Sequence, residues 1–135
     1  MNHKTRLRII GINLALFALL YGLVTLNKDF FRHSFNQTPF ANVLTGSFPN
    51  FISAYLISLA FVNAISIRKP KFGRIIAYSG SIIVFTILTI EELKPMWGAS
   101  TYYDSYDIIA SGLGSLLAII TFETIDYARR RKLEE

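Results

Sequence analysis

Residues 75–90 read "IIAYSGSIIVFTILTI", a run of 16 residues without a charged side chain. Three other stretches, 9–27, 33–67 and 108–122, are equally free of Asp, Glu, Lys and Arg. A helix on the surface of a soluble protein needs a polar face, and none of these stretches supplies one. A membrane-spanning helix needs about 20 mainly apolar residues. We therefore predict an all-α fold, an integral membrane four-helix bundle.

The composition supports this fold class. Hydrophobic residues make up 52% of the chain and charged residues 17%, against about 25% charged in ordinary soluble domains. The sequence contains no cysteine, which excludes disulfides, a thiol nucleophile and a thiolate metal site. We expect a single membrane domain over residues 1–135, with spans at about 8–27, 50–67, 73–92 and 106–126.

Basic residues gather at alternate ends of the predicted spans. Eleven lie before the first span, between the second and third, and after the fourth, whereas three lie at the other ends. Because Lys and Arg of short loops stay cytoplasmic, we expect both termini and the loop 68–74 on the cytoplasmic side. In that tight loop, Pro70 should end the second helix and Gly73 should let the third begin. The net charge of +5 then reflects topology and contact with anionic membrane lipids, and it does not indicate nucleic-acid binding.

The outer connection between the first two spans, residues 28–49, is rich in aromatic side chains. These are Phe30, Phe31, Phe35, Phe40 and Phe48. Aromatic residues at this density near a membrane boundary predict an interfacial or re-entrant segment. We expect Pro39, Gly46 and Pro49 to break the segment into pieces.

Small residues recur at four-residue spacing within the predicted spans. Gly11 and Ala15 form one such stripe, and Ala110, Gly114 and Ala118 form another. Stripes of this kind let helix backbones approach closely in a membrane. They predict a bundle packed through its small residues, and the alternative is a seam between two copies of the chain.

Four of the nine acidic residues lie where the third span ends and the fourth begins: Glu91, Glu92, Asp104 and Asp107. The charge-free runs of these two spans cover about 23–24 Å at 1.5 Å per residue, against a hydrocarbon core of about 30 Å. Some of the acids that bound these runs must therefore reach the interfacial zone or deeper. Charged groups at that depth usually face the bundle interior and have partners there.

Helix capping and the helix macrodipole explain only two of these four acidic residues. Asp104 and Asp107 fit the N-cap and N3 positions of the fourth helix, where the macrodipole stabilises negative charge. Glu91 and Glu92 end the third helix, where the dipole disfavours them. Lys94, Arg32, a bound cation or protonation should compensate these glutamates. At the inner end, Glu123 and Asp126 are expected to pair with Arg129 and Arg130 in solvent.

The cluster predicts an outward-facing acidic pocket. Asp104, Asp107 and Ser111 share one face of the fourth helix, and Asn50 and Tyr55 of the second helix are expected to close the pocket. Trp97 and Tyr103 would seat a ligand at headgroup depth. His33 beside carboxylates is a weak signal for a metal, so the metal stays unknown. No cofactor is predicted.

No nucleophile motif, phosphate-binding loop or metal-ligand spacing occurs in the sequence, so no catalytic residue is predicted. We expect a non-enzymatic protein whose pocket binds a lipid-linked or cationic ligand. The predicted ligand-binding residues are Glu91, Glu92, Asp104, Asp107, Ser111, Asn50, Arg32, Trp97 and Tyr103. One alternative is a small structural subunit of a larger membrane complex or a homo-oligomer. Another is an enzyme acting on lipid headgroups, with one carboxyl as acid and another as base.

An acidic residue at the end of the third helix, a short loop and the acid-x-x-acid of "YDSYDIIASGLG" (103–114) form a recognisable spacing. With "GSFPNFISAYLISLAF" (46–61), it resembles the VanZ-like family of small four-helix bacterial membrane proteins over roughly the last ninety residues. Lys94 stands where that family usually has Gln, and Ser111 where it has Asn. The resemblance implies a protein of the bacterial inner membrane and cell envelope that affects glycopeptide susceptibility, since the family is named for teicoplanin resistance.

Overall fold

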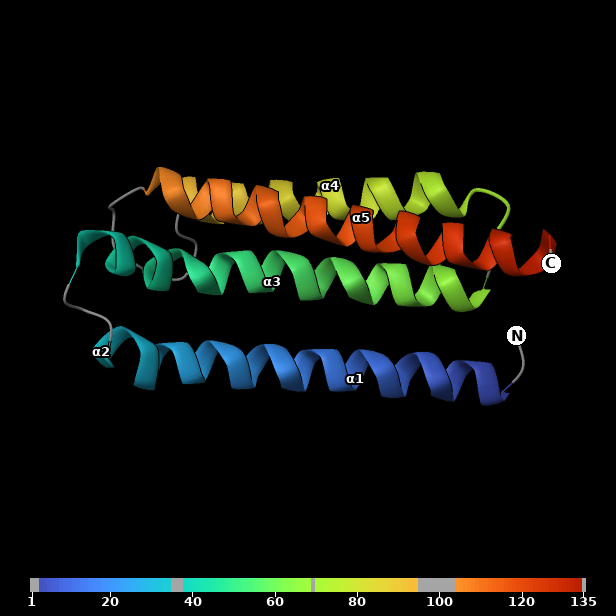
Figure 1. Ribbon diagram of the computed structural model, residues 1–135, viewed down its shortest axis with the longest axis horizontal. Helices are drawn as coiled ribbons and strands as arrows, with labels where there is room; N and C mark the ends of the chain where they lie inside the picture. Colours follow the sequence, from blue (N-terminus) through green and yellow to red (C-terminus); the bar gives the residue numbers. More distant parts are fainter. Residues whose placement is uncertain (1–2, 35–37, 69, 95–103, 135) are drawn as a thin grey trace.

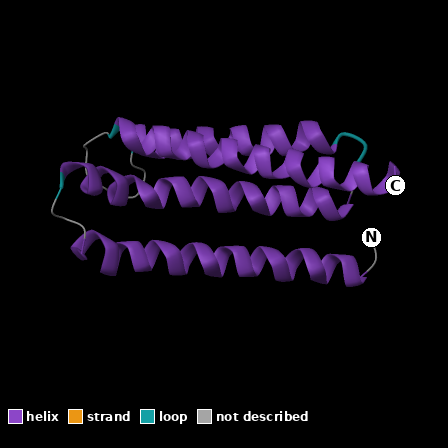
Figure 2. Cartoon of the chain, viewed as in Figure 1, coloured by secondary structure: helices purple, strands orange, loops and turns teal. Residues whose placement is uncertain are grey.

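The computed structural model describes residues 3–34, 38–68, 70–94 and 104–134, and every regular element within them is helical (Figures 1 and 2). The first helix, α1, is followed by a π-helical turn, η1, and by the short helix α2. Three longer helices complete the chain. The elements are α1 (His3–Leu26), η1 (Asn27–Phe31), α2 (Arg32–Ser34), α3 (Pro39–Arg68), α4 (Gly73–Leu93) and α5 (Ser105–Glu134).

Four helical segments are long and apolar enough to cross a membrane: His3–Ser34, Pro39–Arg68, Gly73–Leu93 and Ser105–Arg131. The predicted all-α architecture with four such helices is thereby confirmed. Large apolar side chains point outward along each of them, as Leu14, Ile82 and Leu113 illustrate with exposed fractions of 71%, 59% and 55%. An apolar outer surface with small residues inside suits a multi-pass membrane protein.

The helices run side by side, and α3 is the central one (Figure 1). It contacts α1, α4 and α5, and α4 and α5 also contact each other. Within the described residues, α1 contacts neither α4 nor α5. The fold is therefore a three-helix unit, α3 to α5, with α1 packed against one side of α3.

Small residues bring α3 and α5 together, as the four-residue spacing predicted for α5, whereas Gly11 of the predicted α1 stripe meets no other described helix. Ala54 of α3 and Ala118 of α5 are fully buried. At Gly114 the two backbones are so close that a Cβ would overlap the carbonyl oxygen of Phe51. Glycine is needed at this position because any side chain would push the helices apart.

The outer half of α3 differs from the sequence expectation. Pro39 does mark a boundary, since α3 begins there, but the helix continues without interruption past Gly46 and Pro49. Proline inside a helix leaves the carbonyl four residues earlier without its usual N–H partner. Here that carbonyl belongs to Thr45, and it accepts a hydrogen bond from Nδ2 of Asn27 at 2.8 Å. Asn27 is 1% exposed. A side chain from another helix thus satisfies the group that Pro49 frees, and the expected break does not occur.

The described parts of the aromatic connection are helical. Phe30 and Phe31 lie in η1, which prolongs α1, and Phe40 and Phe48 lie on the first turns of α3. Phe35 lies outside the described residues. At the opposite end, α3 ends at Arg68 and α4 begins at Gly73, as expected for that tight loop.

Candidate functional site

The end of α4 and the start of α5 bring the acidic cluster together. The backbone N–H of Asp104 donates to Oε1 of Glu92 at 3.3 Å, and Glu91, Asp104 and Asp107 all lie within electrostatic range of Glu92. The four carboxylates therefore lie near one another, where α4 ends and α5 begins.

The start of α5 is capped as expected. Oδ1 of Asp104 accepts a hydrogen bond from the N–H of Tyr106, the second residue of the helix, at 2.9 Å. The N–H of Asp107 donates to the carbonyl of Asp104 at 3.2 Å. Asp104 is thus the N-cap and Asp107 the N3 residue. Both carboxylates lie where the macrodipole favours negative charge.

The other carboxylates have no such support. Glu91 and Glu92 lie in the last turn of α4, half-buried, where the macrodipole opposes negative charge. Asp107 is half-buried too, and its Oδ1 is buried without a hydrogen-bond partner. Like charges that share a partly buried site destabilise one another. A nearby positive charge or protonation of a carboxyl would relieve this repulsion.

The cations expected to compensate the acids do not do so in the structure. Within the described segments, no ion pair joins Arg32 or Lys94 to any of the four acids. The guanidinium of Arg32 instead donates to the carbonyl of Gly46 at 3.2 Å, which lies on α3. Lys94 is exposed at the end of α4. Arg32 is at the same end of the bundle but contributes to the α2–α3 connection.

The remaining predicted residues are scattered. Ser111 is buried on α5, at 2% exposure, and Asn50 is half-buried on α3. Tyr55 does not close a pocket at the acids, because its hydroxyl lies 3.3 Å from that of Thr121, much further along α5. Trp97 and Tyr103 lie outside the described residues.

A cavity of about 360 Å³ lies at the same end of the molecule, where Figure 1 shows α2, the first turns of α3, the end of α4 and the start of α5. Its lining is almost wholly apolar: Asn27, Phe31, Phe40, Ala41, Leu44, Thr45 and Phe48. Sequence reasoning singled out three of these phenylalanines as a membrane-boundary pattern and missed the cavity. The missing signal was Asn27, whose hydrogen bond holds η1 against α3.

Charges at the opposite end are paired across helices. Nε of Arg74 lies 2.9 Å from Oε1 of Glu123, which also accepts a hydrogen bond from the hydroxyl of Tyr78 at 2.7 Å. Asp126 pairs with Arg130 at 2.8 Å and with Arg74 at 3.5 Å. The expected pairing of Asp126 with Arg130 is confirmed, whereas Arg74 of α4 is the partner that sequence reasoning missed.

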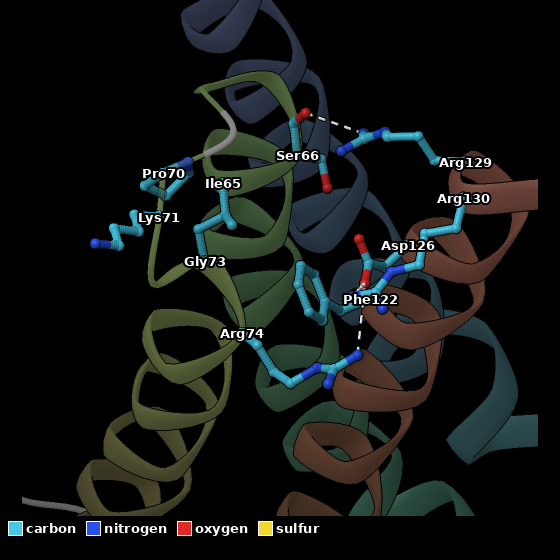
Figure 3. A pocket seen from close by; sticks show the side chains of 10 residues that line it. All are labelled: Ile65, Ser66, Pro70, Lys71, Gly73, Arg74, Phe122, Asp126, Arg129 and Arg130. Carbon is cyan, nitrogen blue, oxygen red and sulfur yellow. Dashed lines mark hydrogen bonds and ion pairs between the residues drawn. The ribbon is translucent and has the colours of Figure 1, made fainter. Parts of the chain in front are cut away.

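Arg129 does not pair with either acid. Its guanidinium donates to the carbonyl of Ser66 at 3.0 Å and so joins α5 to the last turns of α3. The close-up in Figure 3 shows this bond and the contact between Arg74 and Asp126.

Among the residues that the structure describes, no group of three or more His, Asp or Glu side chains is placed to hold a metal ion. His33 is exposed on α2.

Comparison with protein-family models, with curated proteins and with solved structures gives no match for this chain. Any function must therefore be argued from the residues themselves.

Proposed function

We propose that the chain is a multi-pass protein of a bacterial inner membrane that binds a cationic or lipid-linked amphiphile at its acidic end. Both termini would lie in the cytoplasm and the acidic end would face outward. The apolar outer surface of the four helices supports insertion, and the concentration of basic residues at one end of the bundle supports the orientation.

The observation that supports a cationic ligand is the unbalanced negative charge of the acidic end. Four carboxylates lie together, and no cation of the described residues pairs with them. Oδ1 of Asp107 is buried and unpartnered. A positively charged group placed among them would relieve the repulsion between carboxylates and satisfy this oxygen.

The apolar cavity supports an amphiphile over a simple cation. It lies at the same end of the bundle and is lined by Phe31, Phe40, Leu44 and Phe48. A volume of about 360 Å³ falls in the range typical of small-molecule sites, about 300–1,000 Å³. A ligand with a charged head and an apolar tail would place its head at the carboxylates, and the cavity, which lies between η1 and α3, adds an apolar site at the same end of the bundle.

We extend the proposal to antibiotic susceptibility on the basis of the VanZ-like spacing alone. The residues that carry it are Glu91, Asp104, Asp107 and Gly114. Deletion of the protein should then change the teicoplanin susceptibility of its host. An unchanged susceptibility would remove this extension and leave the binding proposal intact.

The binding proposal is tested with dodecylammonium as the cationic probe and dodecanol as the neutral one, on protein in phosphatidylcholine nanodiscs. Dodecylammonium should raise the melting temperature of the wild type, and dodecanol should not. The combined change Glu92→Gln and Asp107→Asn should abolish the rise. Asp29→Asn is the matched control, since Asp29 is an exposed acid of η1 at the same end of the molecule. Equal responses of all proteins to both probes would refute the site.

The orientation is tested separately. The sequence contains no cysteine, so single cysteines introduced at Ser34 and at Lys71 provide clean labelling positions. A membrane-impermeant maleimide added to intact cells should label Ser34→Cys and leave Lys71→Cys unlabelled. The reverse pattern would turn the acidic end to the cytoplasm.

A second candidate function, a subunit of a larger membrane assembly, is favoured by the outer face of α1. A Cβ at Gly11 or Gly22 would meet no atom of the remaining described chain within 4 Å. Glycines in this arrangement leave room for another helix. Native mass spectrometry of gently extracted protein tests this function, and Gly22→Ile should release any partner that packs there.

A further inference from the structure

A second cavity, of about 350 Å³, lies between α3, α4 and α5 at the basic end of the bundle. The side chains drawn in Figure 3 come from all three helices and from the α3–α4 turn, and that of Lys71 points away from the others. They are Ile65, Ser66, Pro70, Lys71, Gly73, Arg74, Phe122, Asp126, Arg129 and Arg130. Its volume is again that of a small-molecule site.

The lining of this cavity is strongly cationic. Lys71, Arg74, Arg129 and Arg130 contribute four positive charges, and Asp126 contributes the one negative charge. Asp126 is already paired with two of the arginines, and Glu123 adds a second partner for Arg74. The surplus charge therefore remains on the other two cations.

No ion pair of the described residues involves either of these two cations. The ammonium of Lys71 lies 5.8 Å from the centroid of the Phe72 ring, and the guanidinium of Arg129 donates to the carbonyl of Ser66. Ser66 also has a buried Oγ without a hydrogen-bond partner. The cavity wall thus holds the guanidinium of Arg129 and an unsatisfied hydroxyl, and the side chain of Lys71 extends outward from its rim.

The cavity also lies at the end of the charge-free runs of α4 and α5. Arg74 directly precedes the charge-free run 75–90, and the run 108–122 ends at Phe122, which lines the cavity and is 6% exposed. Outside the cavity, Ile75 is an exposed apolar residue, at 62%. In the proposed orientation, this is the level at which hydrocarbon gives way to lipid headgroups.

We propose that this cavity binds a phosphate group, and that an anionic phospholipid headgroup supplies it. Arginine donates in a fork that matches phosphate oxygens, and lysine adds a mobile point charge. Basic pockets between membrane helices on the cytoplasmic side suit such headgroups. The inference uses the membrane insertion proposed above, but it does not depend on the acidic end or its ligand.

The test measures retained lipid by native mass spectrometry on protein in neutral detergent, offered equal amounts of phosphatidylglycerol and phosphatidylcholine. The wild type should retain phosphatidylglycerol preferentially. Lys71→Gln should reduce this preference about fivefold, and Lys71→Gln with Arg129→Gln about thirtyfold, which equals about 1 kcal/mol for each removed charge. The single variant keeps the bond from Arg129 to Ser66, so it retains the contact between α3 and α5.

The matched control removes the same charge elsewhere at the basic end. Lys4 and Arg6 are exposed on α1, which does not contact α4 or α5. Lys4→Gln with Arg6→Gln should leave the lipid preference within about twofold, because diffuse attraction contributes little in neutral detergent. An equal loss in the pocket and control variants would overturn the proposal, as would equal retention of the two lipids by the wild type.

A third arm separates the two sources of phosphate. Inorganic phosphate in large excess should not displace phosphatidylglycerol from the wild type, which supports a lipid headgroup as the ligand. If inorganic phosphate displaces the lipid and raises the melting temperature through Lys71, the cavity still binds phosphate but takes it from solution. The cationic probe test at the acidic end has no influence on any of these results, so the two proposals can fail independently.

Discussion

The two ends of the bundle differ in how charged side chains are placed on neighbouring helices. At the basic end, Arg74 of α4 pairs with Glu123 and Asp126 of α5, so opposite charges join neighbouring helices. At the acidic end, the same two helices bring Glu92 and Asp107 together, and like charges face each other. Helix capping supports only the acids of α5 there.

The difference separates charges that stabilise the fold from charges that repel one another. A cross-helix ion pair satisfies both of its members, and its removal costs stability. A group of like charges at a half-buried site lowers the stability of the fold. The expected effects of substitution therefore have opposite signs at the two ends.

The largest effect is expected at Gly114, which seats the α5 segment bearing Asp107 against α3. Gly114→Ala would place a methyl group on the Phe51 carbonyl oxygen and within 3.0 Å of the Ala54 Cβ. The free energy of unfolding should fall by about 1–3 kcal/mol or more, because backbones must separate. It is measured by circular dichroism during titration of SDS into neutral micelles.

Gly22→Ala provides the control for this substitution, since its Cβ would meet no other part of the described chain within 4 Å. Alanine favours the helix by about 1 kcal/mol or less, so stability should stay equal or rise slightly. Equal losses at Gly114 and Gly22 would contradict the close contact between α3 and α5.

A smaller loss is expected at Asn27, which holds η1 to α3 at the acidic end. Asn27→Leu keeps the size of the side chain but leaves the Thr45 carbonyl without a donor, and stability should fall by about 1–3 kcal/mol. Pro49→Ala restores an N–H to that carbonyl from within α3. In the Pro49→Ala background, the cost of Asn27→Leu should therefore shrink. Additive effects of the two changes would show that Asn27 and Pro49 are independent.

The smallest effects test the sign difference directly. Glu123→Gln removes an ion pair with Arg74 and should lower the free energy of unfolding by about 0.2–1 kcal/mol. Glu92→Gln removes charge from a repulsive site at a helix C-terminus, yet its side-chain oxygen can still accept the bond from Asp104. Stability should stay the same or rise by about 0.3–1 kcal/mol.

Both measurements should be repeated at high salt, where surface charge interactions are screened. The loss from Glu123→Gln and the gain from Glu92→Gln should both diminish. If the two substitutions lower stability by the same amount, the acidic end has an internal partner and the contrast between the ends fails.

Sequence patterns were sufficient for the architecture because the membrane-type signal is local. Charge-free runs such as 75–90 predict long apolar helices wherever they occur, and the capping residues Asp104 and Asp107 mark a helix start by short-range chemistry. The close packing at Gly114 was predictable for the same reason, since its stripe of small residues repeats along one helix.

These local patterns could not predict hydrogen bonds between residues that lie far apart in the chain. The start of α3 was misjudged because Pro49 breaks a helix only where its freed carbonyl stays unsatisfied, and the satisfying donor is Asn27, 18 residues away from Thr45. Arg32 was expected at the acids for its charge and its end of the bundle. Its charge does not predict that the guanidinium donates a hydrogen bond to a carbonyl of α3 instead.

Of the three long helices α3, α4 and α5, α1 contacts only α3 within the described residues, and this has a consequence for the order of assembly. α1 leaves the ribosome first, yet the helix it docks on is complete only at Arg68, and Asn63 of that helix supplies a polar link to Asn13 at 2.7 Å. The other neighbours of α3, the helices α4 and α5, pack against each other without contacting α1. We therefore expect α1, although it is synthesised before α3, α4 and α5, to reach its final position only after α3 has formed.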